Sequence, residues 1–332
     1  MLEFLHSVAS VLLILLLTAL GYGMTALGWL KPEAKSFLSR FLLRIIVPCY
    51  CIYGLRTHLT RDAVLAAGAF LAVPLISSLL LIGLSVLAGR LLKLPRRSLG
   101  VFIALCSVSN AFFIGYPMCT ELFGEAAVPH VILYFLINTI FLQMVMMPLI
   151  RWAGEAARDA QGTDPAALAD AKTPGRSSAF LSSLARVFTT PSVIGVLLGL
   201  LILFLDIQLP DIVMSFLRYM NNLVTPLALV LAGCIIHEIG LHHLKIDRVM
   251  IAVLLFRFLL GPVSSFLLIR LFGVEGLGAS VILVEASMPV ATQTVAAATE
   301  YGADESLAAR AVAVTTLATF IDIPLLMFLI PH

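Results

Sequence analysis

Residues 277–301 read LGASVILVEASMPVATQTVAAATEY, a stretch long and apolar enough to cross a bilayer as a helix. Its centre nevertheless carries Pro289, followed by Thr292, Gln293 and Thr294. Proline removes a backbone donor and clashes with the preceding turn, so the helix is expected to break here. Within hydrocarbon, a break is tolerated only where protein or a water-filled cavity satisfies the freed backbone groups. We therefore predict a discontinuous membrane helix that lines a binding site; the simpler alternative is a proline-kinked structural helix.

The composition predicts a polytopic membrane protein. Of the 332 residues, 61% are hydrophobic and only 12% are charged, whereas a soluble domain carries roughly 25% charged residues. The basic residues are spread over short loops, so we predict no nucleic-acid partner. All five cysteines lie in apolar segments without the spacing of metal ligands. We therefore predict no disulfide framework, no metal site and no cofactor.

Windows of about 20 apolar residues predict ten transmembrane helices in an all-α membrane protein. The predicted spans are 7–29, 36–55, 63–91, 99–123, 126–150, 189–205, 211–236, 246–271, 277–301 and 306–331. Residues 1–150 form a first group of five helices, and residues 189–332 form a second group of five. Between them, residues 151–188 are rich in Ala, Gly and Pro and are predicted to be a flexible cytoplasmic linker.

The distribution of Lys and Arg predicts the orientation. Of the 21 basic residues, 15 fall in the loops on one side of the predicted spans and four in the loops on the other. The positive-inside rule places the fifteen in the cytoplasm. We therefore predict a multi-pass protein of the cell membrane with both termini outside the cytoplasm.

The two halves share a register. A shift of 178 residues places Arg40 on Arg218, Pro48 on Pro226 and Ser109 on Ser287. Because each half has an odd number of spans, the halves must be inserted in opposite orientations. Inverted repeats with paired broken helices are typical of secondary transporters.

The same shift pairs the opening stretch with residues 99–123, where Ser107, Ser109 and Asn110 lie in mid-span. Helices 4 and 9 are then expected to run in opposite directions, to cross, and to break near residues 110 and 289. Two half-helix N-termini would face each other, each with free N–H groups and a partial positive charge. Such a crossing predicts an anion-binding site made of backbone.

At these residues the chain resembles the auxin efflux carrier family, which includes the plant PIN carriers and many bacterial members. The first half contributes Arg40-Phe41, Val47-Pro48, Ser109-Asn110, Gly115-Tyr116-Pro117 and Phe123-Gly124; the second contributes Arg257-Phe258-Leu259-Leu260-Gly261-Pro262, Met288-Pro289 and Glu300-Tyr301-Gly302. These pieces reach across nearly all ten predicted spans. Their order and spacing, rather than any single motif, carry the resemblance.

The resemblance implies a division of labour among the ten helices. Helices 1, 2, 6 and 7 would form a scaffold, usually dimeric. Helices 3–5 and 8–10 would form a transport domain that moves as in an elevator, with its substrate at the helix 4/helix 9 crossing. Substrates in the family are organic anions: auxin in plants, and carboxylates such as malonate or malate suggested for bacterial members. The implied partners are therefore a small organic anion, the lipid bilayer and a second copy of the chain.

The residues at the two breaks predict the site. Candidate substrate-binding residues are Ser107, Ser109, Asn110, Pro289, Val290, Thr292 and Gln293, and candidate hinge residues are Pro48, Pro117, Pro226 and Pro289. Plant carriers have a proline where this chain has Ser109 and a glutamine where it has Val290. These departures favour a small carboxylate over indole acetate.

Several charged residues lie well inside predicted spans. Arg257, Glu285 and Asp322 would each cost about 2.5–3.5 kcal/mol at a helix centre, so they are expected to pair or to face water. They predict either a structural ion-pair cluster or a proton or cation site coupled to transport. Arg44 is interpreted as a side chain that extends to the cytoplasmic interface.

Two other functions remain as alternatives to an organic-anion carrier. A sodium-coupled symporter of the bile-acid type shares the inverted-repeat arrangement. It would need acidic and amide ligands around both breaks, where only Asn110, Glu285 and Gln293 are at hand. An intramembrane hydrolase would need a catalytic motif, and the sequence has no GxSxG, HExxH or paired intramembrane aspartates. We therefore predict that the protein is not an enzyme.

Overall fold

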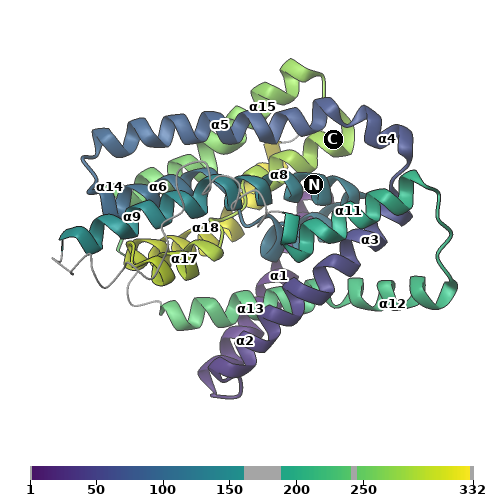
Figure 1. Ribbon diagram of the computed structural model, residues 1–332, viewed down its shortest axis with the longest axis horizontal. Helices are drawn as coiled ribbons and strands as arrows, with labels where there is room; N and C mark the ends of the chain where they lie inside the picture. Colours follow the sequence, from purple (N-terminus) through teal and green to yellow (C-terminus); the bar gives the residue numbers. More distant parts are fainter. Residues whose placement is uncertain (1, 161–187, 241–244, 330–332) are drawn as a thin grey trace.

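In the computed structural model, described over residues 2–160, 188–240 and 245–329, every regular element is a helix. The first half comprises α1 (Leu2–Ala26), α2 (Pro32–Phe41), η1 (Leu42–Ile46), α3 (Val47–His58), α4 (Arg61–Ala66), α5 (Gly68–Leu91), α6 (Arg96–Ser107), η2 (Ala111–Gly115), α7 (Tyr116–Phe123), η3 (Glu125–Ala127), α8 (Val128–Phe141), η4 (Leu142–Met146) and α9 (Met147–Ala160). The second half comprises α11 (Pro191–Phe204), α12 (Asp211–Asn222), α13 (Val224–Ile239), α14 (Arg248–Leu255), η7 (Phe256–Leu260), α15 (Gly261–Phe272), α16 (Gly276–Ala286), α17 (Gln293–Tyr301) and α18 (Glu305–Leu329). Figure 1 shows α5 and α15 along one edge of the molecule and α2 and α13 along the opposite edge.

Seven helical stretches of the described chain are long and apolar enough to cross a membrane: Val8–Ala26, Glu33–His58, Arg61–Leu91, Glu125–Glu155, Asp211–Ile239, Arg248–Phe272 and Glu305–Phe328. They overlap seven of the predicted spans. The predicted sixth span corresponds to α11, a shorter apolar helix. The predicted fourth and ninth spans correspond to the interrupted pairs α6–α7 and α16–α17.

Both predicted interruptions are confirmed. The first half of the fourth span ends at Ser107, and η2 begins only at Ala111. In the ninth span, α16 ends at Ala286 and α17 begins at Gln293. Glycines close the far ends of both pairs, since Gly124 and Gly302 adopt φ values of 72° and 74°, which side chains rarely tolerate.

A helix occupies the start of the predicted linker. Helix α9 continues to Ala160, ten residues beyond the predicted end of the span. Arg151 pairs with Glu155 one turn later, and the Arg96 guanidinium lies 4.4 Å from the centre of the Trp152 ring. Residues 161–187 of the predicted linker lie outside the described chain.

The described residues include four short π-helical segments. Segments η1, η2, η4 and η7 each continue directly into the α-helix that follows. A π-helical turn holds one more residue than an α-helical turn, so it changes which side chains face a neighbour. Three of the segments contribute to the cavity described below, and the fourth, η7, carries Arg257.

The four predicted hinge prolines lie at or just after a change in helical geometry. Pro48 is in the first turn of α3, after η1, and Pro117 is in the first turn of α7, after η2. Pro226 is in the first turn of α13, and Pro289 lies in the break between α16 and α17. Proline is tolerated in a first turn because its missing N–H would have no partner there. Whether these positions act as hinges remains a prediction.

Small residues bring two pairs of helices into close contact. A Cβ placed on Gly21 of α1 would lie 2.0 Å from the Val230 carbonyl oxygen of α13, and one on Gly233 of α13 would lie 1.9 Å from the Thr18 carbonyl oxygen. In the same way, Gly195 and Gly199 of α11 face the backbone of α3. Membrane helices commonly associate through small residues because these let the backbones approach. Helix α1 is therefore fixed on α13, and α11 on α3.

Gly21→Ala is expected to lower the melting temperature in detergent, because the new Cβ meets backbone and must displace α1 from α13. Overpacking of this kind costs about 1–3 kcal/mol. The matched control is Gly23→Ala on the same helix, where a Cβ meets nothing within 4 Å. That change should be neutral or stabilising by about 0.5–1 kcal/mol. Equal melting temperatures for the two variants would contradict the close approach of α1 and α13.

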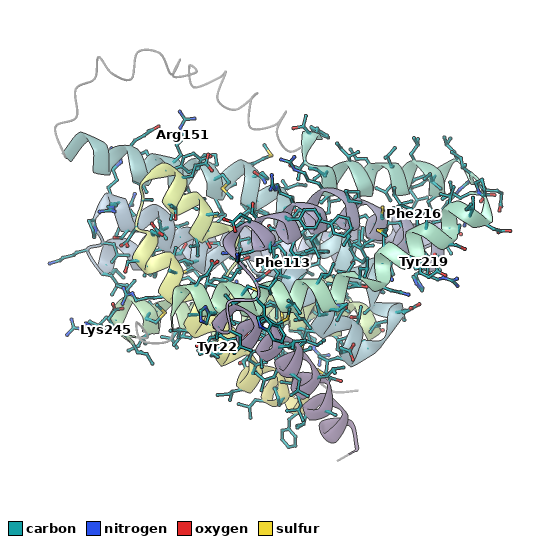
Figure 2. All side chains as sticks on the ribbon, turned by 90° about the horizontal axis from the view of Figure 1, so that it is seen from below. Tyr22, Phe113, Arg151, Phe216, Tyr219 and Lys245 are labelled. Carbon is teal, nitrogen blue, oxygen red and sulfur yellow. The ribbon has the colours of Figure 1, made fainter. Side chains whose placement is uncertain are left out.

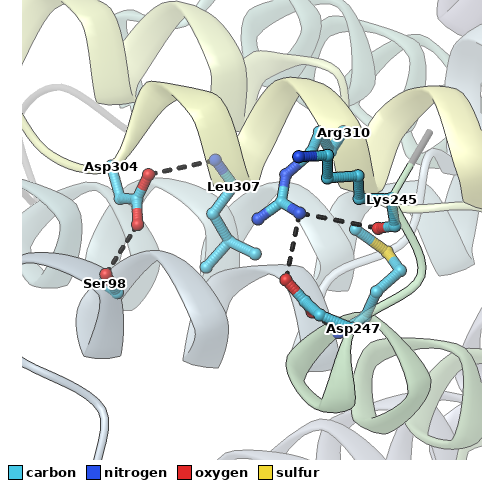
Figure 3. A network of polar contacts seen from close by, with 7 residues as sticks. Ser98, Lys245, Asp247, Asp304, Leu307 and Arg310 are labelled. Carbon is cyan, nitrogen blue, oxygen red and sulfur yellow. Dashed lines mark hydrogen bonds and ion pairs between the residues drawn. The ribbon is translucent and has the colours of Figure 1, made fainter. Parts of the chain in front are cut away.

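The loops rich in basic residues come together at one end of the molecule. Arg310 on α18 pairs with Asp247 before α14, with Nη1 3.0 Å from Oδ2, and Ser98 donates to Asp304 at 2.6 Å (Figure 3). On the other side of this end, Lys35 pairs with Glu238 at the end of α13. Burial alone would raise the pKa of Asp247, but bonds from the Met250 N–H and Arg310 hold that pKa below its ordinary value. Because the pKa is depressed, this cap stabilises the fold at neutral pH and is lost as acid protonates Asp247.

Candidate functional site

The two interrupted helices touch where both are broken. Ser109 and Val290 form an isolated antiparallel β-bridge, and the Asn110 N–H donates to the Pro289 carbonyl oxygen at 2.8 Å. Ser109, Asn110 and Val290 are all buried. The crossing predicted near residues 110 and 289 is therefore present, and backbone hydrogen bonding holds it.

Asn110 has two separate roles at the first break. Its Oδ1 accepts a hydrogen bond from the Phe113 N–H at 3.2 Å, which caps the second half of the helix (Figure 2 labels Phe113 near the centre of the molecule). Its Nδ2 is buried and has no partner among the described residues. A buried donor left unpaired costs about 1–3 kcal/mol. The amide therefore presents a free donor, in addition to capping the helix.

Side chains from neighbouring helices bind the non-helical backbone at both breaks. Asn138 of α8 donates from Nδ2 to the Ser109 carbonyl oxygen at 2.9 Å and accepts from the Ser109 N–H at 3.3 Å. At the second break, the Val290 N–H donates to Thr315 Oγ1 of α18 at 3.2 Å. The sequence reasoning identified neither Asn138 nor Thr315, because a lone polar residue in an apolar helix gives no signal about its partner.

Arg257 binds the second break through carbonyl groups. Its Nε and Nη2 donate to the Met288 carbonyl oxygen at 3.0 and 2.6 Å, and Nη2 also donates to the Ala286 carbonyl oxygen at 3.0 Å. The side chain is 1% exposed. These carbonyls lie at the C-terminal end of α16, where the helix dipole is negative and a cation is favoured.

The three charges of the predicted cluster do not pair directly. Among the described residues, no ion pair joins Arg257 to Glu285 or Asp322. Glu285 instead packs against Gly115 of η2, where an added Cβ would lie 2.4 Å from Oε2, and its Oε1 accepts from Cys119 Sγ at 3.8 Å. Glu285 is fully buried, and these contacts connect the two interrupted helices.

A cavity of about 240 Å³ lies beside the crossing. Its wall includes Ser109, Asn110, Ala111 and Phe112 from the first break and Gln293 from the start of α17. Further polar lining residues are Arg44 of η1, Asn138 and Thr139 of α8, Gln143 of η4, and Thr190 and Ser192 at the start of α11. Among the described lining residues there is no aspartate or glutamate, and Arg44 is the one fully charged side chain.

The helical segments that follow the two breaks, η2 and α17, begin with backbone N–H groups that have no acceptor in the described chain. In the described chain, the N–H groups of Ala111 and Phe112 have no acceptor, and neither do those of Thr292 and Gln293. A helix N-terminus carries about half a positive charge. Of these residues, Ala111, Phe112 and Gln293 line the cavity. Together with Arg44 and the Asn110 amide, their N–H groups make it electropositive and suited to an anion.

The structure separates the predicted site residues into two groups. Ser109, Asn110 and Gln293 lie in the cavity wall. Ser107 does not, because it faces Ser85 of α5 across 3.5 Å. Pro289, Val290 and Thr292 are not among the lining residues; Pro289 and Val290 act through the backbone bonds of the crossing.

Arg44 and Gln143 were missed as site residues. Arg44, interpreted from the sequence as a side chain that extends to the cytoplasmic interface, is exposed and lies in the cavity wall. Both residues lie in π-helical segments, whose extra residue per turn shifts the faces that an α-helical period would assign.

Interrupted, crossing membrane helices around an electropositive cavity define a membrane transporter. A family model described as "Membrane transport protein" matches residues 6–327. An uncharacterized transporter of Methanocaldococcus jannaschii is 26% identical over 323 residues, covering 95% of this chain and 96% of the relative. An uncharacterized transporter of Methanothermobacter thermautotrophicus is 24% identical over 330 residues, covering 97% and 98% of the two chains.

The chain belongs to this membrane transport protein family, the auxin efflux carrier family, over nearly its whole length. The predicted family resemblance is thereby confirmed. The protein is a multi-pass membrane transporter, not an enzyme.

Proposed function

We propose that the protein is a secondary carrier of small organic anions, most of all carboxylates, with the substrate bound beside the crossing. The observation that carries this proposal is the described part of the cavity wall: unpaired donors from both breaks, one arginine and no acidic lining residue. A carboxylate would accept bonds from these donors and balance the charge. The volume of about 240 Å³ lies below the range of roughly 300–1,000 Å³ common for drug-sized ligands, which favours a small acid.

The proposed mechanism is alternating access of the elevator type, in ten spans arranged as two inverted repeats. The described packing is consistent with two bodies. Helices α1, α3, α11, α12 and α13 pack mainly on one another, and α5, α6, α9, α15 and α17 do likewise. In this proposal the first group is a scaffold, which also forms a homodimer, and the second carries the crossing between the two sides of the membrane.

The contacts of Arg257 argue against the sodium-coupled alternative. Carbonyl oxygens at the end of a broken helix are natural ligands for a coupling cation. Here the Ala286 and Met288 carbonyls accept hydrogen bonds from the guanidinium instead. A fixed cation thus already stands at the second break.

A thermal-shift screen of the purified protein against a panel of small carboxylates tests the proposed function. A ligand at 100 times its Kd stabilises the folded state by about 2.7 kcal/mol, which is readily measured. Proteoliposomes loaded with an acid that raises the melting temperature should also take up that acid in counterflow. This uptake should occur both with and without sodium. If no acid in the panel does either, the organic-anion proposal fails.

The proposed topology places both termini outside the cytoplasm. It is supported by the bias of 15 basic residues to four and by the meeting of Lys35, Arg97, Asp247 and Arg310 at one end of the molecule. A C-terminal reporter that is active only in the cytoplasm should give no signal, whereas the same reporter inserted after Gly162 should give a strong one. A strong C-terminal signal would remove one span and with it the inverted repeat.

A further inference from the structure

Arg44 is an exposed side chain near the middle of an apolar helical stretch. It lies in η1, eleven residues after the start and fourteen before the end of the apolar stretch Glu33–His58. A charged side chain at the centre of a membrane helix is unfavourable and marks a functional site unless a partner neutralises it.

No partner for Arg44 is found in the described chain. None of the ion pairs there includes it, and no hydrogen bond of its guanidinium is present. Arg40, one turn earlier, differs: its Nε donates to the Ser36 carbonyl oxygen. The unpaired guanidinium therefore belongs to the residue in the cavity wall, and not to its neighbour on the same helix.

The cavity brings Arg44 and the free Asn110 amide into one wall from two different elements. Arg44 belongs to the continuous helix α2–η1–α3, which packs on α11, whereas Asn110 belongs to the crossing. A ligand that fills the cavity would contact both. Because an arginine fork binds a carboxylate with two parallel bonds, it distinguishes an anion from a neutral amide of the same size.

We propose that Arg44 is the charge-selecting residue of this site, pairing with the ionised carboxylate of the ligand while Asn110 contributes a neutral donor. This inference rests on the proposed function. It adds that the positive charge that neutralises the ligand comes from the second span and not from the crossing. It also follows that the ligand loses Arg44 as its partner if the crossing moves relative to α2–η1–α3.

Three ligands of nearly equal size test the proposal: succinate, succinamate and succinamide, which carry two, one and no negative charges at pH 8. Affinities are measured by thermal shift and isothermal titration on the purified full chain. In the native protein we expect affinity to rise with charge. In Arg44→Gln the affinity for succinate should fall by about 10- to 100-fold, and the three ligands should bind within a few fold of one another.

Matched variants separate the possible outcomes. Arg40→Gln, one turn away and outside the wall, should bind all three ligands as the native protein does. Arg44→Lys should retain the charge order with lower affinity, because it keeps the charge and loses the fork. Asn110→Ala should weaken all three ligands together and leave their order unchanged.

The melting temperature without ligand distinguishes binding from structure. Since Arg44 has no partner in the described chain, Arg44→Gln should leave that temperature unchanged or raise it. A fall of several degrees, or a charge order that survives in Arg44→Gln, would overturn the assignment while leaving the proposed function intact. If the native protein binds none of the three ligands at tens of millimolar, the anion site itself is refuted, and the role of Arg44 with it.

Discussion

Arg257→Ala is expected to destabilise the protein by about 3–5 kcal/mol and to reduce its folded yield sharply. The substitution removes three hydrogen bonds to the carbonyls of Met288 and Ala286, at a site where Arg257 is buried. Each carbonyl left unpaired and buried costs about 1–3 kcal/mol. The non-helical segment between α16 and α17 would then lose the guanidinium that fixes it against η7.

The measurement is the melting temperature and monodisperse yield in detergent. Arg270→Ala is the matched control, since that arginine lies at the end of α15 against the Phe266 ring and is exposed. It should change stability by no more than about 0.5 kcal/mol. Arg257→Lys should recover only part of the loss, because an ammonium cannot fork between two carbonyls.

Chemical rescue sharpens the test. Guanidinium ion at low millimolar concentration should raise the melting temperature of Arg257→Ala and leave the native protein unchanged, because it can re-enter the site beside the break. Sodium at equal concentration should not. An Arg257→Ala protein that folds normally, but whose ligand binding no longer depends on pH, would instead assign Arg257 to coupling.

The breaks were predictable because their cause is visible in the sequence. Pro289 interrupts an apolar run, and no continuous helix can satisfy the backbone on both sides of it. The crossing was predictable from the register between the halves, which paired Asn110 with the region of Pro289. These predictions follow from backbone rules that hold whatever the neighbours are.

The partners of the charged residues were not predictable in the same way. Arg257 was expected to seek the acids of neighbouring spans, but its acceptors are carbonyls, and a carbonyl has no residue type by which a sequence could reveal it. The site residue Arg44 was missed for a different reason. Its facing depends on η1, and a π-helical turn leaves no clear mark in a sequence of leucine and isoleucine.

The second large effect is expected at Asn110, where the structure combines two roles that sequence reasoning had treated as rivals. Asparagine could cap the second half of the helix or bind the substrate. Its Oδ1 caps the helix by accepting the Phe113 N–H, and its Nδ2 has no partner in the described chain. The two roles can therefore be removed separately.

Asn110→Ala removes both roles and should weaken anion binding by about 10- to 100-fold, the equivalent of one lost charge-assisted hydrogen bond. It should also lower stability by about 1 kcal/mol through the lost cap. Thr60→Ala is the matched control for capping alone, since Thr60 Oγ1 accepts the Ala63 N–H at the exposed start of α4, away from the cavity. Thr60→Ala should cost similar stability and leave binding unchanged.

Asn110→Asp gives the sharper result. Aspartate caps a helix as well as asparagine does, so the variant should fold with near-native stability. Its second oxygen replaces the free Nδ2 donor and places a negative charge against the anion, so binding should fall further than in Asn110→Ala. Titration of each variant with the best acid from the carboxylate panel measures this order. An Asn110→Asp protein that binds and transports that acid normally would show that the carboxylate does not lie at the crossing, because no anion site tolerates a like charge in place of its donor.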